Sequence, residues 1–562
     1  MKWIKENKIF VGLILFLSCV CLFFIGQKQG FHEDEIFSYG SSNYKYDNVF
    51  RSYGYAQANY DYLYTNLLQG DFFTQAKNFW NFLFHSSQYE TSYDPVLKAE
   101  VPTWQDKEQA LKYLTIQKED TLNFFSVWFN QLEDVHPPLF YFLVHIFSCF
   151  TQNHFTKYTI FFLNLFFFIG TLYILYKIIL FFAPKNWANL AVFFYGISMG
   201  AISTVMFQRM YMMLTFFTLF YLYYSLKFLK EKNFTKKDFF LWGMSICLGF
   251  LTQYYFAIFA VILFLVLAGY FMKKKEYSSL KKMFLVHAIG AFIGILFFPS
   301  SIEDIFFSYR GIGGGSDRTK STLEMLLYFL NSILHSFSIP IWFFLLFIFL
   351  GIGYIIWNRK KLNLDFFKEK TIWILIIPIF LVLLIVSKMS PFLGEDYTSR
   401  YVMFLLPILV ITIIYLLSRS KNQKIFIGST LVILFLSGFG LLTEKPTYLY
   451  EKNEKVLALA EEYQEDSFIY IYDNYFTHLS SLPEFLIYQK TLILNHNIYD
   501  FSLLQKDEYL NSQTEVILCI KNWLNTEELL NKVLENTHFT EATLLLSIKE
   551  DINADYYKLT VS

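Results

Sequence analysis

The sequence predicts a polytopic α-helical membrane protein with a small α/β domain at its C-terminus. Apolar runs long enough to cross a bilayer recur between residues 9 and 442. Of the 562 residues, 55% are hydrophobic and 17% are charged, whereas soluble domains carry roughly 25% charged residues. After residue 446 the apolar runs become short and alternate with helix-like stretches, as in an α/β domain.

Clusters of lysine and arginine set the expected orientation of the spans. Cytoplasmic loops carry an excess of these residues, and four such clusters lie at 227–237, 273–282, 359–370 and 419–424. The first apolar run is interpreted as an uncleaved span, because it is long and no small-residue cleavage site follows it. With these clusters and the N-terminus inside, spans are expected near 8–26, 158–182, 186–206, 210–228, 238–254, 255–272, 283–300, 338–357, 371–389, 401–418 and 424–442.

Two further apolar stretches, 138–152 and 321–336, are short for a spanning helix of about 20 residues. Either both lie at the interface or both cross, which gives 11–13 transmembrane helices. An odd number of spans places the C-terminal tail outside. The expected division is a transmembrane domain, 1–445, followed by an extracytoplasmic α/β domain, 446–562.

The tail and the first loop each contain recognisable elements. In the tail, strands are expected at "SFIYIYD", "TLILNHN", "EVILCI" and "YYKLTVS", and helices at "NEKVLALAEEY" and "TEELLNKVLEN". The loop 27–137 contains two aromatic stretches, 71–84 and 120–132, which are expected to form amphipathic helices on the bilayer surface. The alternative is a compact extracellular helix pair.

Several function classes are not indicated. The formal net charge is zero, and no basic patch alternates with base-stacking aromatic residues, so no nucleic-acid partner is expected. The five cysteines form no disulfide framework, and no cysteine–histidine spacing predicts a structural metal site.

The densest acidic cluster follows the first span, in "GFHEDEIFSYGSS", as Glu33, Asp34 and Glu35. One interpretation is a solvated turn beside the membrane. The expected outer face also carries cations near span ends: Arg209, Arg310, Lys388 and Arg400. Ionisable groups at membrane depth are costly and usually mark a site, although each arginine taken singly could also reach for a lipid headgroup.

Carboxylates and arginines at one membrane face suit a specific chemistry. Arginine binds phosphate or diphosphate groups, in bidentate fashion where geometry permits. A carboxylate can take the proton from an incoming hydroxyl, while the arginines neutralise charge on the departing phosphate. The predicted reaction is glycosyl transfer from a lipid-phosphate sugar, outside the cytoplasmic membrane.

Four motifs, in order, carry a resemblance to a known superfamily: "HEDEIFSYG", "HPPLFYFLVHIF", "QRMYMMLTFF" and "SRYVMFLLP". The chain resembles the GT-C glycosyltransferases that use polyprenyl- or dolichyl-phosphate sugars, and is similar to the protein O-mannosyltransferase and lipid A aminoarabinose transferase groups. "LTQYYFAIF", 251–259, also resembles a turn between two spans of that superfamily. The resemblance implies a GT-C type membrane domain and a hexosyl- or pentosyltransferase activity.

The resemblance also implies roles for individual residues. Asp34 would take the acceptor proton in an inverting transfer, and Glu35 would shape the site or bind the sugar. The implied substrate-binding residues are Arg209, Tyr211, Arg400, Tyr401, His136 and Lys388. Of these, the two arginines would hold the phosphate, and His136 is expected to orient the Pro-Pro turn rather than act as an acid.

One departure from the superfamily bears on cofactors. Many relatives carry Glu before the arginine of the third motif, where this chain has Gln208. Glu133 and Asp134 are candidates to supply the missing charge. Two alternatives stay open, a site without a metal and one in which the acids bind Mg²⁺ or Mn²⁺ beside the phosphate.

Rival interpretations use the same residues differently. A flippase for lipid-linked sugars would need the cations without the chemistry, but no repeated broken spans are evident. A lipid-linked oligosaccharide polymerase would place its large outer loop later in the chain, and a structural or sensory protein would leave the ordered motifs unexplained. The expected partners are a polyprenyl-phosphate sugar, membrane lipid, and a protein, glycan or glycolipid acceptor.

Overall fold

A computed structural model provides the structure of the chain. It describes residues 6–45, 70–85, 102–132, 134–231, 234–306, 320–343, 345, 349, 369–419, 423–473, 477–549 and 553–561. The chain divides into two compact units. The helical unit comprises Met1–Gly26, Val135–Phe140 and Ile160–Thr447, and the α/β unit comprises Gln27–Asp134, Tyr141–Thr159 and Tyr448–Ser562.

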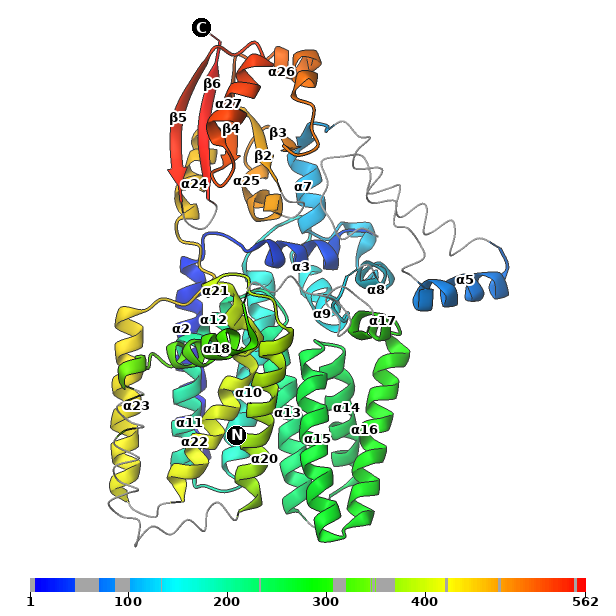
Figure 1. The fold of residues 1–562 in the computed structure, drawn as a ribbon, viewed down its shortest axis with the longest axis vertical. Coiled ribbons are helices and arrows are strands. Elements are labelled where there is room, and N and C mark those ends of the chain that lie inside the picture. Colours follow the sequence, from blue (N-terminus) through cyan, green and yellow to red (C-terminus); the bar gives the residue numbers. More distant parts are fainter. Residues whose placement is uncertain are drawn as a thin grey trace. The chain divides into compact units, whose positions relative to one another are not determined.

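The helical unit is built from long apolar helices (Figure 1). Within the described residues, seven are long and apolar enough to cross a membrane: α2 (Lys8–Gln27), α10 (Tyr158–Ile179), α13 (Tyr211–Lys230), α15 (Tyr255–Lys274), α16 (Tyr277–Phe297), α20 (Lys370–Met389) and α23 (Gln423–Thr443). Two consecutive helices, α11 (Lys185–Gly196) and α12 (Met199–Met206), are bent by 57° at their junction and count as an eighth if they form one span. The predicted fold class, a polytopic helical protein with a small C-terminal sheet, is confirmed.

Most expected spans coincide with helices. The stretch 238–254 corresponds to α14 (Lys236–Phe250), and 401–418 corresponds to α22 (Leu406–Ser418), which follows two short 3₁₀ turns. The span expected at 338–357 lies largely outside the described residues. Helix positions are predictable because a run of about 20 apolar residues in lipid has to satisfy its backbone hydrogen bonds internally.

The two short apolar stretches form short helices. They are α9 (Leu139–Ser148), with 10 residues, and α18 (Thr322–Ser336), with 15 residues. At 1.5 Å per residue both fall well short of a hydrocarbon core of about 30 Å. Helix α18 begins with a capping box between Ser321 and Glu324, and Figure 1 shows it running across the long helices of its unit, where it packs on α20.

Small residues allow close helix packing within the bundle. A Cβ atom added to Gly290 on α16 would lie 2.8 Å from the backbone oxygen of Gly243 on α14. The Tyr221 hydroxyl on α13 lies 2.7 Å from His287 Nε2 on α16. Small residues at the contact and polar groups between helices are both typical of packing in membranes.

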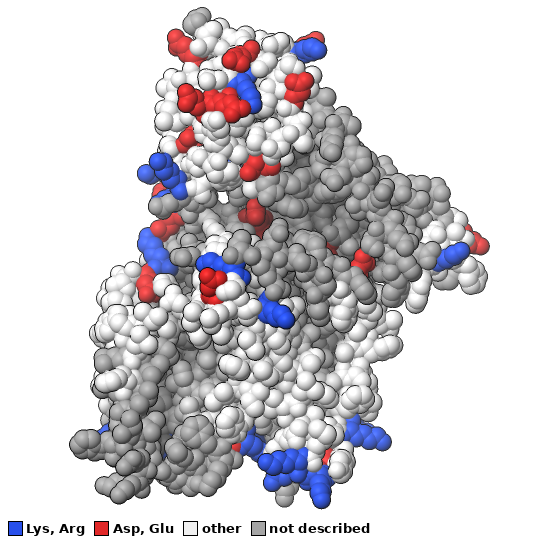
Figure 2. Space-filling view, viewed as in Figure 1, with Lys and Arg blue, Asp and Glu red and all other residues white. Residues whose placement is uncertain are grey.

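Charge is distributed unevenly along the helical unit. Figure 2 shows lysine and arginine gathered at one end of this bundle, beyond a broad uncharged band. Helices α13 and α15 contribute to this cationic end with Lys227, Lys230, Lys273 and Lys274 in their last turns. The arrangement agrees with the lysine clusters used to predict the orientation, and the orientation itself stays a prediction.

The α/β unit is organised around a mixed sheet. In its described part the strand order is β1-β3-β2-β4-β6-β5. Its strands are β1 (Gln105–Asp106), β2 (Ser467–Tyr472), β3 (Lys490–Asn495), β4 (Glu515–Lys521), β5 (Glu541–Ile548) and β6 (Ala554–Thr560). Strands β3, β2 and β4 are parallel, and the flanking strands are antiparallel to their neighbours. The four predicted tail strands correspond to β2, β3, β4 and β6.

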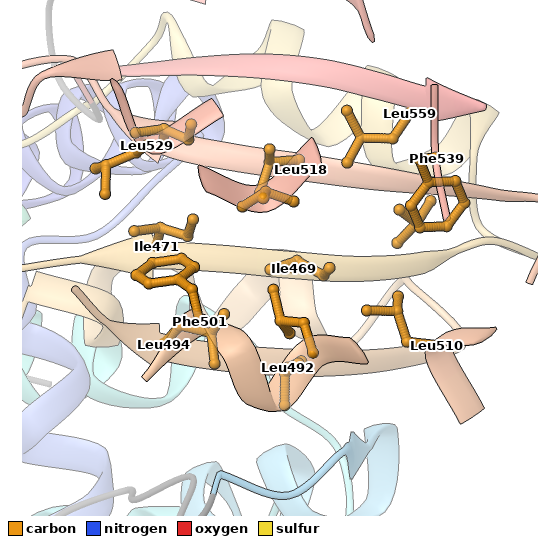
Figure 3. Packing of buried hydrophobic residues seen from close by; sticks show 14 residues of the cluster. Ile469, Ile471, Leu492, Leu494, Phe501, Leu510, Leu518, Leu529, Phe539 and Leu559 are labelled. Atoms are coloured by element: carbon orange, nitrogen blue, oxygen red, sulfur yellow. The ribbon is translucent and has the colours of Figure 1, made fainter. Parts of the chain in front are cut away.

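The two faces of this sheet differ in chemistry because side chains alternate along each strand. One face carries the aliphatic core, in which Ile469 and Ile471 of β2 pack with Leu518 of β4 and Leu529 of α27 (Thr526–Glu535) (Figure 3). The other face is aromatic: Phe468 stacks on Tyr488 with ring centres 4.3 Å apart. Both predicted tail helices are present, as α24 (Asn453–Glu462) and α27.

The first loop and the tail share one compact unit, a relation that the predicted domains 1–445 and 446–562 did not include. Strand β1 comes from the first loop and pairs with β3 of the tail. The loop also supplies helices α3 (Glu33–Asn43), α5 (Phe72–His85), α7 (Lys107–Leu114) and α8 (Phe124–Leu132). Helices therefore occupy most of 71–84 and 120–132, whereas their placement on the bilayer surface stays a prediction.

Candidate active site

The three acids form the first turn of helix α3. His32 is the N-cap residue: its ring accepts a hydrogen bond from the Asp34 N–H at 3.0 Å. In return, the His32 N–H donates to the Glu35 carboxylate at 2.8 Å, which completes a capping box. Carboxylates are also favoured at a helix N-terminus by the backbone dipoles. Local chemistry thus explains why a helix begins at this cluster.

Glu35 is held by a buried ion pair. Lys28 Nζ lies 3.0 Å from both of its carboxylate oxygens, and neither side chain is exposed to solvent. Burial lowers the pKa of Lys28, and the neighbouring carboxylate opposes this shift. Since its oxygens accept from Lys28 and from the His32 backbone, Glu35 shapes the first turn.

Asp34 differs from Glu35 in accessibility. Its side chain is 29% exposed, whereas that of Glu35 is 0% exposed. Its carboxylate lies 3.6 Å from His32 Nδ1. The same nitrogen accepts the Asp34 N–H in the capping box. Of these two acids, Asp34 is the one that is accessible to solvent.

The arginines lie in the helical unit, at interruptions of its helices. Arg209 occupies the break between α12 and α13, and Arg400 lies in the 3₁₀ turn η4 (Ser399–Tyr401). They are 3% and 5% exposed, respectively. Charged groups buried to this extent are costly unless they are paired and hydrogen-bonded, and within membrane domains they usually mark a site.

The structure brings four of the predicted substrate-binding residues together. The Arg400 guanidinium carbon lies 5.5 Å from the Phe207 ring centre and 5.3 Å from that of Tyr401. Phe207 in turn stacks on Tyr211, with ring centres 5.6 Å apart and planes at 18°. The turn that holds Arg400 and Tyr401 therefore packs against the segment that holds Arg209 and Tyr211.

An asparagine that the sequence analysis did not single out stabilises this break. Asn164 on α10 is fully buried, and its side-chain amide donates to the backbone oxygens of Val205 at 3.2 Å and Phe207 at 2.8 Å. These carbonyls lie at the end of α12, where a helix lacks internal partners. In the sequence, the only indication of this role was that Asn164 is a lone amide within the aromatic run "FFLNLFFF".

Tyr255 is a second residue that the sequence analysis did not assign to the site. Its ring centre lies 5.5 Å from that of Tyr401, the neighbour of Arg400 in the chain. Its hydroxyl lies 2.9 Å from Ser390 Oγ, at the end of α20. The motif "LTQYYFAIF" contains Tyr255, but the sequence alone does not show that it packs beside the arginine turn.

The remaining predicted residues have different settings. His136 lies in the bend before Pro137 and is partly exposed. Just after it, the Leu139 N–H donates to the Leu251 backbone oxygen at 3.1 Å, so the His-Pro-Pro segment contacts the "LTQYY" turn. Lys388 is exposed in the last turn of α20.

The predicted site residues are divided between the two units. Asp34 and Glu35 belong to the α/β unit, and the predicted binding residues belong to the helical unit. The convergence of the Asp34 carboxylate with Arg209 and Arg400 on one pocket therefore stays a prediction. Within the residues that the structure describes, no group of three or more His, Cys, Asp or Glu side chains is arranged to hold a metal ion.

Comparison with known proteins gives one family match. A family model described as "Dolichyl-phosphate-mannose-protein mannosyltransferase" matches residues 135–302. This range includes the His-Pro-Pro, "QRMY" and "LTQYY" motifs and excludes the acidic cluster and the "SRYV" motif. No curated protein matches the chain.

Several solved structures align with the chain at low identity. ArnT from Cupriavidus metallidurans in the apo state is 10% identical, covers 75% of this chain and 87% of its own, and gives a TM-score of 0.43. The same protein bound to undecaprenyl phosphate is 11% identical with the same coverage and TM-score. An Archaeoglobus fulgidus oligosaccharyltransferase in complex with zinc and sulfate is 13% identical, covers 71% and 61%, and gives 0.34.

The family match bears directly on the resemblance inferred from the motifs. It covers three of the quoted segments, in the same order along the chain. The predicted resemblance to membrane glycosyltransferases that use lipid-phosphate sugars is confirmed, and over residues 135–302 the chain is similar to the dolichyl-phosphate-mannose-protein mannosyltransferase family.

Proposed function

We propose that the protein is a multi-pass membrane glycosyltransferase that moves a sugar from a polyprenyl-phosphate donor to an acceptor hydroxyl at the outer face of the cytoplasmic membrane. The observation that carries this proposal is a group of buried residues, Arg209, Arg400 and Phe207, which we call the arginine cluster. Arg400 stacks on Phe207, two residues from Arg209, and both guanidinium groups are almost fully buried. Two buried guanidinium groups at helix breaks suit a lipid-linked phosphate, which they bind through charge and paired N–H donors.

The reaction balances with few protein groups. The Asp34 carboxylate takes the proton of the acceptor hydroxyl, and the acceptor oxygen forms a bond to the anomeric carbon. The bond between that carbon and the phosphate oxygen breaks, and its electron pair leaves with the lipid phosphate. Arg209 and Arg400 neutralise this charge as it develops. Attack opposite the leaving phosphate inverts the anomeric configuration.

The partial exposure of Asp34 supports its assignment as the base, because an acceptor has to reach the carboxylate. Glu35 positions the turn through its bonds with Lys28 and His32. Two arginines supply the positive charge that a phosphate leaving group needs, and a divalent cation is not required for this neutralisation. Tyr211 and Tyr401 line the arginine cluster, and His136 and Lys388 are proposed to contact the donor.

The substrates are proposed by class. The description of the matching family makes a polyprenyl-phosphate mannose the first donor to test and a protein hydroxyl the first acceptor. Other hexosyl or pentosyl donors, and glycan or glycolipid acceptors, use the same leaving-group chemistry. Both the active site and the C-terminal sheet are proposed to face away from the cytoplasm.

The test uses the purified full-length protein in liposomes with polyprenyl-phosphate mannose and a peptide that supplies serine and threonine hydroxyls, and measures the release of polyprenyl phosphate. Asp34→Asn is expected to lower turnover by about 10²–10⁴-fold, the contribution typical of a general base. Donor binding, measured by thermal shift, should persist. Asp71→Asn is the matched control, since Asp71 is an acid in the same loop that caps α5.

Two outcomes would overturn the proposal. Turnover of Asp34→Asn equal to that of the wild-type protein would remove the assigned base. Donor translocation across the liposome membrane without release of polyprenyl phosphate, retained in Asp34→Asn, would identify a flippase instead.

A further inference from the structure

Lys28 connects the acidic turn to the beginning of the C-terminal domain. Its ammonium group donates to both Glu35 oxygens and also to the backbone oxygen of Tyr448. We propose that Lys28 is a positioning residue, through which the C-terminal domain fixes the first turn of α3 and thereby orients Asp34. This inference rests on the proposed function, since it assigns a purpose to the orientation of Asp34.

The backbone around Lys28 reinforces this connection. The Gln29 N–H donates to the Leu449 backbone oxygen at 2.8 Å. Gly30 packs so closely on Asn453 that an added Cβ atom would lie 1.9 Å from the Asn453 side-chain nitrogen. We call residues 28–30 together with 448–453 the clamp. Lys28 and Tyr448, which the clamp joins, lie 420 residues apart in the sequence. The clamp therefore forms only when the C-terminal domain has folded.

The C-terminal half of the clamp has an unusual backbone. Tyr448 and Tyr450 have φ values of 70° and 51°, in a region of backbone conformation that residues other than glycine rarely adopt. Both residues are buried, and the Lys28 ammonium lies 5.2 Å from the Tyr450 ring centre. Such conformations persist only where the surroundings hold them, and they concentrate at functional sites. The strain agrees with a segment held in place for a purpose beyond connecting two domains.

The sheet carries a second buried lysine, Lys521, at the end of β4. Burial lowers the pKa of Lys521, and the charge of Glu33 is among those that oppose this shift. Helix α3 also packs on the 3₁₀ turn η6 (Thr477–Ser481) of the tail. The first turn of α3 is therefore held by Lys28 through Glu35, and the helix packs on the tail through η6. Asp34 lies between Glu33 and Glu35 in the chain.

Catalysis gives this arrangement its importance. A base has to lie within about 3 Å of the proton that it removes, and a displacement of about 1 Å can cost about 100-fold in rate. Helix α3 also packs on α7, α8 and η6, and the clamp fixes its first turn, which carries Asp34. Loss of the clamp should therefore lower the rate of transfer more than the binding of the donor.

The experiment has to separate positioning from simple stability. Removing Lys28 alone leaves the Glu35 carboxylate buried without its cation, which is strongly destabilising. The informative variant is Lys28→Met combined with Glu35→Gln, because glutamine can still complete the capping box. The matched control is Lys227→Met combined with Asp238→Asn. That pair joins a lysine to a capping-box acid in the same way, with 2.7 Å between Lys227 Nζ and the Asp238 carboxylate, in the helical unit.

Two measurements are made on the full-length protein: hydrogen exchange, and kinetics with polyprenyl-phosphate mannose. In the Lys28/Glu35 double variant, amide exchange in 29–36 and 448–453 should rise by about tenfold or more, and kcat should fall by about tenfold or more. KM for the donor should stay within about twofold. The control pair should change neither exchange in these segments nor kcat.

A folded double variant with wild-type exchange in 448–453 and wild-type kcat would overturn the inference. Raised exchange with an unchanged kcat would also overturn it, because the clamp would then be structural only. If the wild-type protein releases no polyprenyl phosphate from any donor, the proposed function fails, whereas the exchange measurement still tests the clamp.

Discussion

The guanidinium carbon of Arg400 lies 5.5 Å from the ring centre of Phe207, a residue far away in the sequence and two positions before Arg209. A guanidinium that stacks on a ring directs its N–H donors outward in its own plane, which suits bidentate binding of phosphate. The contact joins two motifs that the sequence presents separately, and it is the basis of the first prediction.

Arg400→Lys should weaken donor binding although the charge is retained. A lysine ammonium is a compact point charge that neither stacks on Phe207 nor binds phosphate in bidentate fashion. We expect KM for polyprenyl-phosphate mannose to rise by about tenfold, which corresponds to about 1.4 kcal/mol. Arg419→Lys, at a helix end with its own tyrosine contact, serves as the control. An unchanged KM and kcat in Arg400→Lys would contradict the assigned role.

Asn164→Leu should destabilise the break that carries Arg209. The substitution leaves the carbonyls of Val205 and Phe207 buried without their side-chain donor, at a cost of about 1–3 kcal/mol. Thermal unfolding in detergent should show a lower midpoint, and donor affinity should fall with it. Thr171→Val is the control on the same helix, because Thr171 bonds only within α10, to Phe167. Equal midpoints for the two variants would argue against the role of Asn164.

Gly290→Ala should loosen the contact between α14 and α16. The added methyl group would meet the Gly243 backbone oxygen at 2.8 Å, a distance that requires the helices to separate. Overpacking of this kind costs about 1–3 kcal/mol, and the thermal midpoint of the purified protein measures it. At Gly269 on α15 an added Cβ meets nothing within 4 Å. Gly269→Ala should therefore leave the midpoint unchanged or raise it slightly.

The α/β unit should lose stability as the pH rises from 4.5, the ordinary pKa of a glutamate, to about 7, the pKa of Glu484 in the folded protein. Glu484 is 2% exposed, and its carboxylate accepts from the Tyr556 hydroxyl at 3.0 Å. Burial raises the pKa of Glu484 from 4.5 to about 7. Between these values the folded state retains a proton that the unfolded state releases, so stability falls with rising pH, by roughly 3 kcal/mol in total.

Urea unfolding of the full-length protein, followed by hydrogen exchange in β2 and β4 between pH 5 and pH 8, tests this expectation. Glu484→Gln should remove the dependence, because glutamine does not titrate. A stability that rises over the same range in the wild-type protein would contradict the assigned cause.

The sequence was most informative where a single stretch of chain carries the signal. The helices at 158–182, 210–228 and 371–389 were predictable from apolar runs alone, because in lipid a continuous apolar segment has to be helical. The tail strands β2, β3 and β4 were predictable from short β-branched and aromatic runs bounded by polar residues. Strand β1 was not, because its two residues are in a strand only through pairing with β3.

The candidate site was only partly predictable. The motifs identified Asp34, Glu35, Arg209 and Arg400 as candidates, but not that Glu35 is buried in an ion pair while Asp34 is partly exposed. Glu35 forms a buried ion pair with Lys28. In the sequence, Lys28 looks like an ordinary lysine at the end of a span. Asn164 and Tyr255 were missed because a lone amide or tyrosine in an apolar run carries no signal of its own.

By itself, the sequence determined that the chain spans a membrane, that a small sheet follows the spans, and which motifs resemble those of membrane glycosyltransferases that use lipid-phosphate sugars. Only the tertiary structure decided that the first loop and the tail form one unit, that Lys28 binds both Glu35 and Tyr448, and that the Arg400 guanidinium lies over the ring of Phe207, two residues before Arg209. The reason is physical. Hydrophobic runs act through backbone geometry over adjacent residues, whereas ion pairs and stacked rings depend on distances that only packing of distant segments sets.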